Sequence, residues 1–242
     1  MTMRRPARFA CYYGLNRLER LADYDLVILQ AEHYTLADML HLRERGTLPL
    51  GYLSLSEIAA SESAAPWALP DARNPHWNTV LVDCRSEDWQ RFVVAERIPY
   101  LLQRGIQGFF LDTVDVPEQY AELLPGVECL LRRIRAHYPD LTLLVNRGFA
   151  VLETVAAMAD GVVFESFTTY HDGSRYVAWT GRDLLWTARM AVLVQHALGP
   201  RPILTIDYAA PDDIALRQQA KQRAKAYGFT PFVSTYALDW LP

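Results

Sequence analysis

Eight short apolar runs recur along the chain, and their pattern is the feature that most restricts how the chain can fold. Most of these runs are near-continuous in apolar residues rather than alternating, which is typical of strands covered on both faces, as in parallel sheets. Amphipathic segments with helical periodicity separate them. The eight predicted strands span residues 8–14, 25–31, 48–55, 106–112, 141–146, 161–166, 202–208 and 230–236.

The intervening segments predict helices that would cover such a sheet. Thr35 begins one of them, with Asp38 three residues on, and Ser86 begins another that ends at Gly105. Pro99 lies inside this second helix, so we expect a kink or a break there. The predicted helices span residues 15–22, 35–45, 87–104, 118–138, 149–158, 181–198 and 212–227.

This alternation predicts an α/β fold, a (β/α)8 barrel that forms a single domain over residues 1–242. The chain is 51% hydrophobic, which is ample for one large core, and barrels of this size fold as single units. An open doubly wound sheet is the alternative. However, "YYGLNRLERL" after the first predicted strand has one glycine, not the glycine-rich phosphate loop of dinucleotide-binding sheets. The barrel is therefore favoured.

One long insertion breaks the rhythm. Residues 55–78 are rich in Ala, Ser and Pro, and a short extra strand is predicted after them at 79–83. Loops of this length in compact domains are usually functional or mobile. The insertion follows the third strand, so in a barrel it lies on the face that carries active sites. We expect it to form one wall of a cleft, to which Trp67 contributes.

Composition excludes several classes of protein. The net charge is −4 and the basic residues are scattered, which indicates no nucleic-acid partner, and no run is long and apolar enough to span a membrane. Cys11, Cys84 and Cys129 are far apart and form no C-x-x-C, so neither a disulfide framework nor a zinc site is expected. The six histidines form no H-x-H or H-E-x-x-H pair, so we expect no metal and no other cofactor. The absence of G-x-S-x-G disfavours an acyl-transfer triad.

Polar residues at the strand ends predict a sugar site. Catalytic groups of a barrel lie at the C-terminal ends of its strands, and here those ends carry many carboxylates and tyrosines and no lysine. Asp112 ends "GFFLD", and Glu165 lies between two phenylalanines, where an acid is rarely buried without a partner or a task. We predict these two as the catalytic pair. The predicted substrate-binding residues are Tyr12, Tyr52, Glu57, Asp83, Asp115, Asn146, Asp207, Tyr208 and Tyr236.

Several of these residues have an equally open structural role. Asp115, Asp207 and Asn146 are of types that favour helix caps and turns. The aromatic residues could stack on sugar rings or pack in the core and loops. The candidate stacking platforms are Tyr12, Tyr52, Trp67, Trp77, Tyr170, Trp179, Tyr208 and Tyr236.

A set of stretches in a fixed order resembles a known family. They are "YDLVILQ", "LPLGYLSLSE", "WNTVLVDCRSEDW", "RGIQGFFLDTVD", "LVNRG", "DGVVFESF", "ILTIDYA" and "YGFTPFVS". Together they cover nearly the whole chain and resemble glycoside hydrolase family 114, the endo-α-1,4-polygalactosaminidase-like barrels. The resemblance implies hydrolysis of α-1,4-linked galactosamine or N-acetylgalactosamine polymers with retention. It also implies an acidic pair at Asp112 and Glu165, as nucleophile and general acid/base.

The chain departs from this family at three places. The usual Gly-Glu after the third strand appears as Ser56-Glu57, and Thr113 and Arg147 stand where the family usually has asparagine. These differences leave the acidic pair in place and bear on which sugar is recognised.

The resemblance also suggests a partner. Partly deacetylated galactosaminoglycan is cationic, and a mouth rich in Asp and Glu would attract it. Two other functions stay open: a non-catalytic glycan-binding barrel, or a barrel enzyme acting on a small intracellular carbohydrate. The N-terminal stretch "MTMRRPARFACYYG" lacks a signal-type apolar run, which predicts either an intracellular protein or an export signal that has been removed. The resemblance, by contrast, implies a secreted or periplasmic protein.

Overall fold

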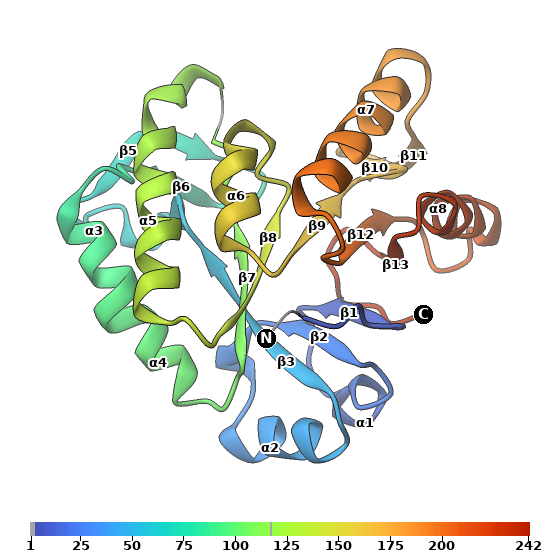
Figure 1. The fold of residues 1–242 in the computed structure, drawn as a ribbon, viewed down its shortest axis with the longest axis horizontal. Coiled ribbons are helices and arrows are strands. Elements are labelled where there is room, and N and C mark those ends of the chain that lie inside the picture. Colours follow the sequence, from blue (N-terminus) through green and yellow to red (C-terminus); the bar gives the residue numbers. More distant parts are fainter. Residues whose placement is uncertain (1–2, 117) are drawn as a thin grey trace.

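The computed structural model describes residues 3–116 and 118–242 and confirms the predicted (β/α)8 barrel. Eight strands follow the order β1-β2-β3-β7-β8-β9-β12-β13, and each is parallel to its neighbours. The helices lie outside the strands (Figure 1). The strands are β1 (Phe9–Tyr12), β2 (Leu26–Leu29), β3 (Leu48–Ser54), β7 (Gly108–Asp112), β8 (Thr142–Asn146), β9 (Gly161–Glu165), β12 (Ile203–Tyr208) and β13 (Thr230–Ser234).

The first and last strands lie side by side at the seam of the barrel. The rings of Phe9 in β1 and Phe232 in β13 are both buried, with their centroids 5.7 Å apart. Just beyond the strands, the Tyr13 backbone N–H donates to the Leu238 carbonyl oxygen at 2.8 Å. The seam is therefore held by buried aromatic packing and by a hydrogen bond between segments more than two hundred residues apart.

The helices form the outer layer, and those after Thr35, Ser86 and Asp213 begin with a side-chain cap at these residues. Thr35 and Asp38 form a capping box: Asp38 N–H donates to the Thr35 hydroxyl at 3.2 Å and Thr35 N–H donates to Asp38 at 2.8 Å. Within the described residues, no helix is apolar over a length that would carry it through a membrane. The helices are α1 (Leu18–Leu21), α2 (Leu36–Glu44), α3 (Glu87–Phe92), α4 (Ile98–Leu102), α5 (Leu124–His137), α6 (Leu152–Met158), α7 (Gly181–Leu198) and α8 (Ile214–Ala226), with short 3-10 turns η1 (Ala31–His33), η2 (Ala60–Glu62), η4 (Glu118–Leu123) and η5 (Phe149–Val151).

The break predicted around Pro99 is confirmed. A π-helical turn, η3 (Val93–Arg97), separates α3 from α4, and Pro99 is the second residue of α4. Proline has no N–H for an α-helical bond, and its ring would clash with the carbonyl four residues earlier. The wider π turn relieves this conflict while the helical path continues.

The insertion after β3 is folded rather than irregular. It contains β4 (Glu57–Ala59) and β5 (Ala68–Asn74), which pair on either side of β6 (Thr79–Val82) in an antiparallel sheet of order β4-β6-β5. The predicted extra strand is therefore β6, outside the barrel. A second excursion, the hairpin of β10 (Thr169–His171) and β11 (Tyr176–Ala178), follows β9. The insertion sheet and the hairpin stand on either side of the barrel's upper end in Figure 1.

Candidate active site

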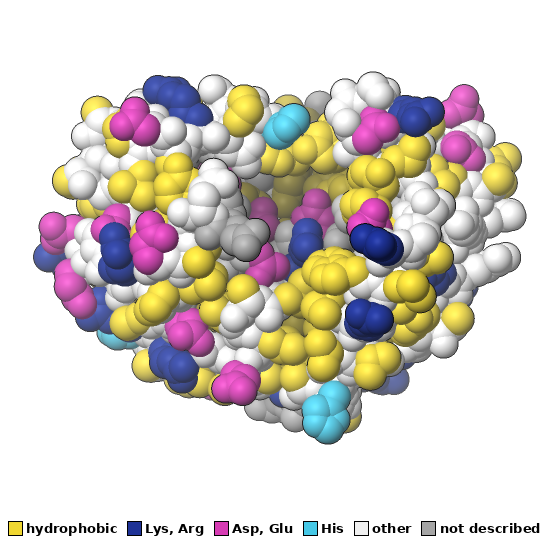
Figure 2. Space-filling view, turned by 90° about the horizontal axis from the view of Figure 1, so that it is seen from above, with side chains coloured by type: hydrophobic (Ala, Val, Ile, Leu, Met, Phe, Trp, Pro, Cys, Tyr) yellow, Lys and Arg dark blue, Asp and Glu magenta, His cyan; other side chains and the backbone are white. Residues whose placement is uncertain are grey.

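A cavity of about 520 Å³ opens at the C-terminal ends of the barrel strands. Figure 2 looks onto this end of the molecule and shows acidic side chains gathered in and around a hollow, with a basic side chain among them. Alternation along β7 places Phe110 and Asp112 on the same face, and both line the cavity. Six residues predicted for the site line it: Tyr52, Glu57, Asp112, Asp115, Glu165 and Tyr208.

One amide joins the two predicted catalytic carboxylates. Asn146 ends β8, between the ends of β7 and β9, and its side-chain nitrogen donates to Oδ1 of Asp112 at 2.8 Å and to Oε2 of Glu165 at 2.6 Å. Asn146 is only 7% exposed and does not line the cavity that Asp112 and Glu165 line, so it lies beneath the pair. The two bonded oxygens can be no farther apart than the sum of these two bond lengths.

Glu165 sits in surroundings that favour its protonated form. Burial, and then the negative charge of Asp112, raise the pKa of Glu165 above its ordinary value. Hydrogen bonds act in the opposite direction: the Tyr208 hydroxyl donates to Oε1 at 2.6 Å, and Asn146 donates to Oε2. Glu165 therefore keeps its proton to higher pH than an exposed glutamate. When it releases the proton, Tyr208 and Asn146 stabilise the carboxylate that forms, as a general acid requires.

The backbone is strained directly after the pair and the bridging asparagine. Thr113, Arg147 and Ser166 each follow one of these three residues, and their φ angles are 56°, 54° and 55°. Left-handed backbone is uncommon outside glycine, and for a β-branched residue such as Thr113 it is an outlier. Strain of this kind persists only where the surrounding structure fixes it, and it tends to cluster at active sites. Each strand end is thus turned sharply just after it presents its side chain.

The side chain of Thr113 helps to hold its own turn. Its hydroxyl oxygen accepts hydrogen bonds from the backbone N–H groups of Leu55 and Ser56, at 3.1 and 3.0 Å, and lies 2.8 Å from the hydroxyl of Ser54. The Ser56 hydroxyl in turn donates to the Thr113 carbonyl at 2.5 Å. These bonds fasten the end of β7 to the start of the insertion, and so fix the direction in which Asp112 points.

Asp115 lines the cavity and also organises the loop after β8. Its carboxylate accepts the backbone N–H groups of Gly148 and Ala150 at 3.1 and 3.2 Å, and Nε of Arg147 lies 3.8 Å away. Burial raises the pKa of Asp115, while the bonds from Ala150 and Gly148 and the charge of Arg147 oppose this. The turn role that the sequence left open is therefore present in the structure.

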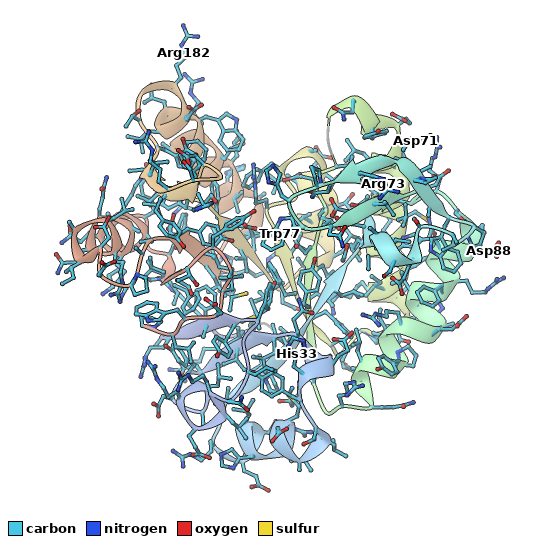
Figure 3. All side chains as sticks on the ribbon, turned by 180° about the vertical axis from the view of Figure 1, so that it is seen from behind. His33, Asp71, Arg73, Trp77, Asp88 and Arg182 are labelled. Atoms are coloured by element: carbon cyan, nitrogen blue, oxygen red, sulfur yellow. The ribbon has the colours of Figure 1, made fainter. Side chains whose placement is uncertain are left out.

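The insertion supplies one wall of the cavity, as predicted. Glu57 accepts a hydrogen bond from Asn74 at 3.2 Å and another from the Thr79 hydroxyl, and all three line the cavity. Trp77 is 49% exposed and packs against Tyr236 with ring centroids 5.0 Å apart. Figure 3 shows Trp77 lying over the middle of the barrel, whereas Asp71 and Arg73 lie on the outer part of the insertion sheet.

Two predicted substrate-binding residues face away from the cavity and have structural roles instead. Tyr12 is buried, and its hydroxyl donates to the Leu15 carbonyl at 3.0 Å, whereas the next residue, Tyr13, lines the cavity. Asp207 is fully buried and its Oδ1 accepts two backbone N–H groups from the segment after β9, whereas Tyr208 lines the cavity. Successive strand side chains point to opposite faces, so neighbours cannot both face inward.

Five further residues lie elsewhere than expected. The carboxylate of Asp83 is bound by Arg85, at 2.8 Å to Nε, and it lies outside the cavity lining because β6 belongs to the insertion sheet. Trp67 packs on α3, with its ring 5.1 Å from Phe92, and so belongs to the outer side of the insertion. Tyr236 does not line the cavity itself but packs behind Trp77 and Tyr208. Tyr170 and Trp179 do not line the cavity either, and they stack on each other with ring centroids 3.7 Å apart.

Some lining residues were not predicted. Each of three such residues directly follows the last residue of a barrel strand, so the expectation that site residues lie at strand ends could have identified them: Tyr13, Gln30 and Arg147. Asn74 reaches the cavity only because β5 pairs with β6, and no local sequence pattern predicts that pairing. Among the described residues, no cluster of three His, Cys, Asp or Glu side chains could hold a metal ion.

Comparison with known proteins agrees with this geometry. The chain matches the family described as glycoside-hydrolase family GH114 over residues 3–241. The glycoside hydrolase domain of PelA from Pseudomonas aeruginosa is 30% identical, with 98% of this chain and 97% of that chain covered and a TM-score of 0.83.

Two further proteins extend the comparison. Ega3 from Aspergillus fumigatus, solved in complex with galactosamine, shares the fold with a TM-score of 0.68, at 14% identity over 97% of this chain and 92% of that one. An uncharacterized protein of Deinococcus radiodurans is 26% identical over 162 residues, which are 63% of this chain and 50% of that protein. The match thus spans about half the length of this curated relative.

Proposed function

The chain belongs to glycoside hydrolase family GH114 and is a glycosidase, and on this premise we propose that it cleaves α-1,4-linked galactosamine or N-acetylgalactosamine polysaccharide with retention of configuration. The cavity supports a sugar of this kind, because three acids besides Glu165 line it and would attract the free amino groups of a partly deacetylated polymer. The galactosamine complex of the structurally similar Ega3 points to the same class of substrate.

The observation that carries this proposal is the bridge through Asn146. Retaining glycosidases hold their two carboxyl groups about 5–5.5 Å apart, and inverting ones about 6.5–9.5 Å apart, because an inverting enzyme must fit a water molecule between base and sugar. The oxygens of Asp112 and Glu165 that share one amide nitrogen, at 2.8 and 2.6 Å, cannot be farther apart than these two lengths together, which is short of the inverting range. The spacing therefore supports direct attack by a carboxylate.

In the proposed mechanism, Asp112 attacks the anomeric carbon while Glu165 protonates the departing glycosidic oxygen. Asn146 holds Oδ1 of Asp112, and Oδ2 is the oxygen that we assign to the attack. Once Glu165 has lost its proton, the donors Tyr208 and Asn146 stabilise the resulting carboxylate. Glu165 then takes a proton from the water molecule that releases the sugar from Asp112.

The rest of the cavity would bind the polymer. Burial and the nearby charge of Asp112 raise the pKa of Tyr52 above its ordinary value, so its hydroxyl stays protonated and can donate to a sugar oxygen. Trp77, half exposed and backed by Tyr236, offers an aromatic face for a sugar ring. Glu57, held by two donors from the insertion, can accept a hydrogen bond from a hydroxyl or amino group.

Release of reducing ends from a galactosamine polymer tests the catalytic assignment. Asp112→Asn and Glu165→Gln should each lower the rate by at least about a hundredfold, the lower range for acid–base catalysis. Asp83→Asn is the matched control, because it neutralises a carboxylate outside the cavity that Arg85 already binds. Near wild-type turnover in either of the first two variants, with thermal unfolding unchanged, would exclude that residue from the chemistry.

The stereochemistry has its own test. NMR of the first-formed product should show the α-anomer if configuration is retained. An initial β-anomer would make Asp112 a general base that activates water. Binding of the polymer without any new reducing ends would instead favour a glycan-binding protein.

A further inference from the structure

A single basic side chain lines the cavity among the residues that the structure describes there. Arg147 follows the bridging Asn146 and faces the same space as Asp112, Asp115 and Glu165. Its backbone N–H donates to the Val163 carbonyl at 2.8 Å, which ties it to β9 two residues before Glu165. A cation thus stands at one side of a cavity whose other charged groups are carboxylates.

Aromatic rings hold this cation in place. The guanidinium carbon lies 5.3 Å from the ring centre of Phe149 and 5.6 Å from that of Trp186, and these two rings meet edge to face. Asp115 is the nearest acid, but 3.8 Å is longer than a hydrogen bond, and backbone N–H groups already occupy the Asp115 carboxylate. Nε of Arg147 is buried and has no hydrogen-bond partner. The guanidinium is therefore fixed in position without forming a hydrogen-bonded ion pair with a carboxylate.

The place of Arg147 relative to Glu165 decides which sugar it meets. Both side chains line the cavity, and the backbone bond to Val163 holds Arg147 against the strand that ends at Glu165. In the proposed mechanism, Glu165 faces the glycosidic oxygen that leaves. Arg147 therefore lies beside the sugar on the leaving-group side of the bond that breaks.

The two forms of the proposed substrate differ in what they offer to such a group. The free amine of galactosamine is an ammonium ion at neutral pH, which a guanidinium repels. The acetamide of N-acetylgalactosamine is neutral, and its carbonyl oxygen is an acceptor for arginine, which has only donors. We propose that Arg147 makes the enzyme select an N-acetylated sugar beside Glu165 and reject one with a free amine there. This inference rests on the proposed function and assigns the acetylation state that it leaves open.

Matched oligosaccharides test the proposal. Fully N-acetylated and fully deacetylated galactosamine oligomers of equal length are compared by kcat/KM for reducing-end release. The wild-type protein should favour the acetylated oligomer, and Arg147→Gln should lower that preference by about ten- to hundredfold, the range that a charge-assisted hydrogen bond supplies. Arg147→Lys keeps the charge and should keep the rejection of the free amine.

A control variant separates this effect from a general change of charge. Arg182→Gln makes the same change of net charge at the exposed start of α7, which Figure 3 shows projecting far from Trp77 and the cavity. Its ratio of the two kcat/KM values should equal that of the wild type. Affinities of the two oligomers measured in the Glu165→Gln background, where turnover is removed, give a second readout that should follow the same order.

The possible outcomes separate failure of the Arg147 inference from failure of the proposed function. Cleavage of both oligomers with no preference, or an unchanged ratio in Arg147→Gln, would overturn the role of Arg147 and leave the proposed function standing. Cleavage of neither oligomer would overturn both. If Arg147→Gln fails to fold, the ratio in Arg147→Lys decides, since loss of the rejection there would also contradict the proposal.

Discussion

Removing the Tyr208 hydroxyl should change the pH dependence of the enzyme in a known direction. This hydroxyl donates to Oε1 of Glu165 at 2.6 Å and stabilises the carboxylate form. Without it, burial and the charge of Asp112 act with less opposition, so the pKa of Glu165 should rise further. Tyr208→Phe keeps the ring and deletes only the donor, which makes it the cleanest single change at this carboxyl.

The size of the shift follows from the strength of the bond. A hydrogen bond to a charged group contributes about 1.5–3 kcal/mol, and one pKa unit corresponds to about 1.36 kcal/mol. We therefore expect the pKa of Glu165 to rise by about one to two units. Because Glu165 must be protonated to act as the acid, the basic limb of the kcat/KM profile should move to higher pH by that amount.

The assay is reducing-end release measured across the pH range for the wild-type protein and for Tyr208→Phe. Tyr236→Phe is the control, because its ring packs against Tyr208 and no hydrogen bond joins its hydroxyl to Glu165 in the structure. The basic limb of the control should stay in place, whatever happens to its rate. A basic limb in Tyr208→Phe that stays within about 0.3 unit, or moves to lower pH, would refute the assignment of Glu165 as the acid.

Three other predictions concern stability and binding. The folded pKa of Asp207 is raised by burial to about 7 from 3.8, so the folded state holds a proton that the unfolded state releases. Asp207 should therefore lower the free energy of unfolding by about 2–4 kcal/mol between about pH 4 and pH 7. In urea unfolding of Asp207→Asn, whose oxygen can still accept both backbone N–H groups, the fall should be smaller by this amount, and the contributions of Glu165 and Asp115 should remain. Thr113→Val removes the acceptor of the Ser56 N–H and one of the two acceptors of the Leu55 N–H, which also bonds the Asp112 carbonyl. It should cost about 1–3 kcal/mol in the same assay, while Thr113→Ser should cost less than about 1 kcal/mol. Trp77→Ala should raise KM for the polymer by about two- to tenfold through lost stacking, with kcat little changed; an unaffected KM would remove Trp77 from the binding surface.

The barrel could be predicted because its strands are buried on both faces. A run such as that of β2, in which Leu26 to Leu29 are all buried, cannot be stable on a solvated sheet, and eight such runs separated by helices leave few other folds. The same rule located Asp112 and Glu165, since polar side chains that follow buried runs must emerge at the barrel mouth.

The same continuity explains what could not be predicted at the site. A strand that is apolar on both faces shows no alternation, so nothing in its sequence tells which of two consecutive residues faces inward. The strand-end rule predicts Tyr12, whereas Tyr13 lines the cavity. It predicts both Asp207 and Tyr208, although only one of that pair can face the sugar. Neighbouring aromatic or polar residues at a strand end are therefore ambiguous until the register is known.

The insertion was beyond prediction for a different reason. Its wall function followed from its place after the third strand, but its sheet depends on long-range pairing of β4, β5 and β6, which no local periodicity encodes. That pairing turns Asn74 and Trp77 toward the cavity and leaves Trp67 on the helix side. The composition of the segment, rich in Ala, Ser and Pro, pointed instead to an irregular loop.

The left-handed backbone at Thr113, Arg147 and Ser166 matters for anyone who tries to make this protein more heat-resistant. Each such residue costs about 1–2 kcal/mol relative to ordinary backbone. At Thr113 the hydrogen bonds of the hydroxyl offset this cost, but glycine or asparagine at Arg147 or Ser166 would look attractive in a screen for melting temperature. Yet these turns also restrict the movement of the strand ends that carry the catalytic side chains, and glycine would increase the flexibility of the backbone there. Selection for heat resistance alone should therefore yield variants with a higher melting temperature and a lower turnover rate, because the spacing of the two acids is no longer fixed.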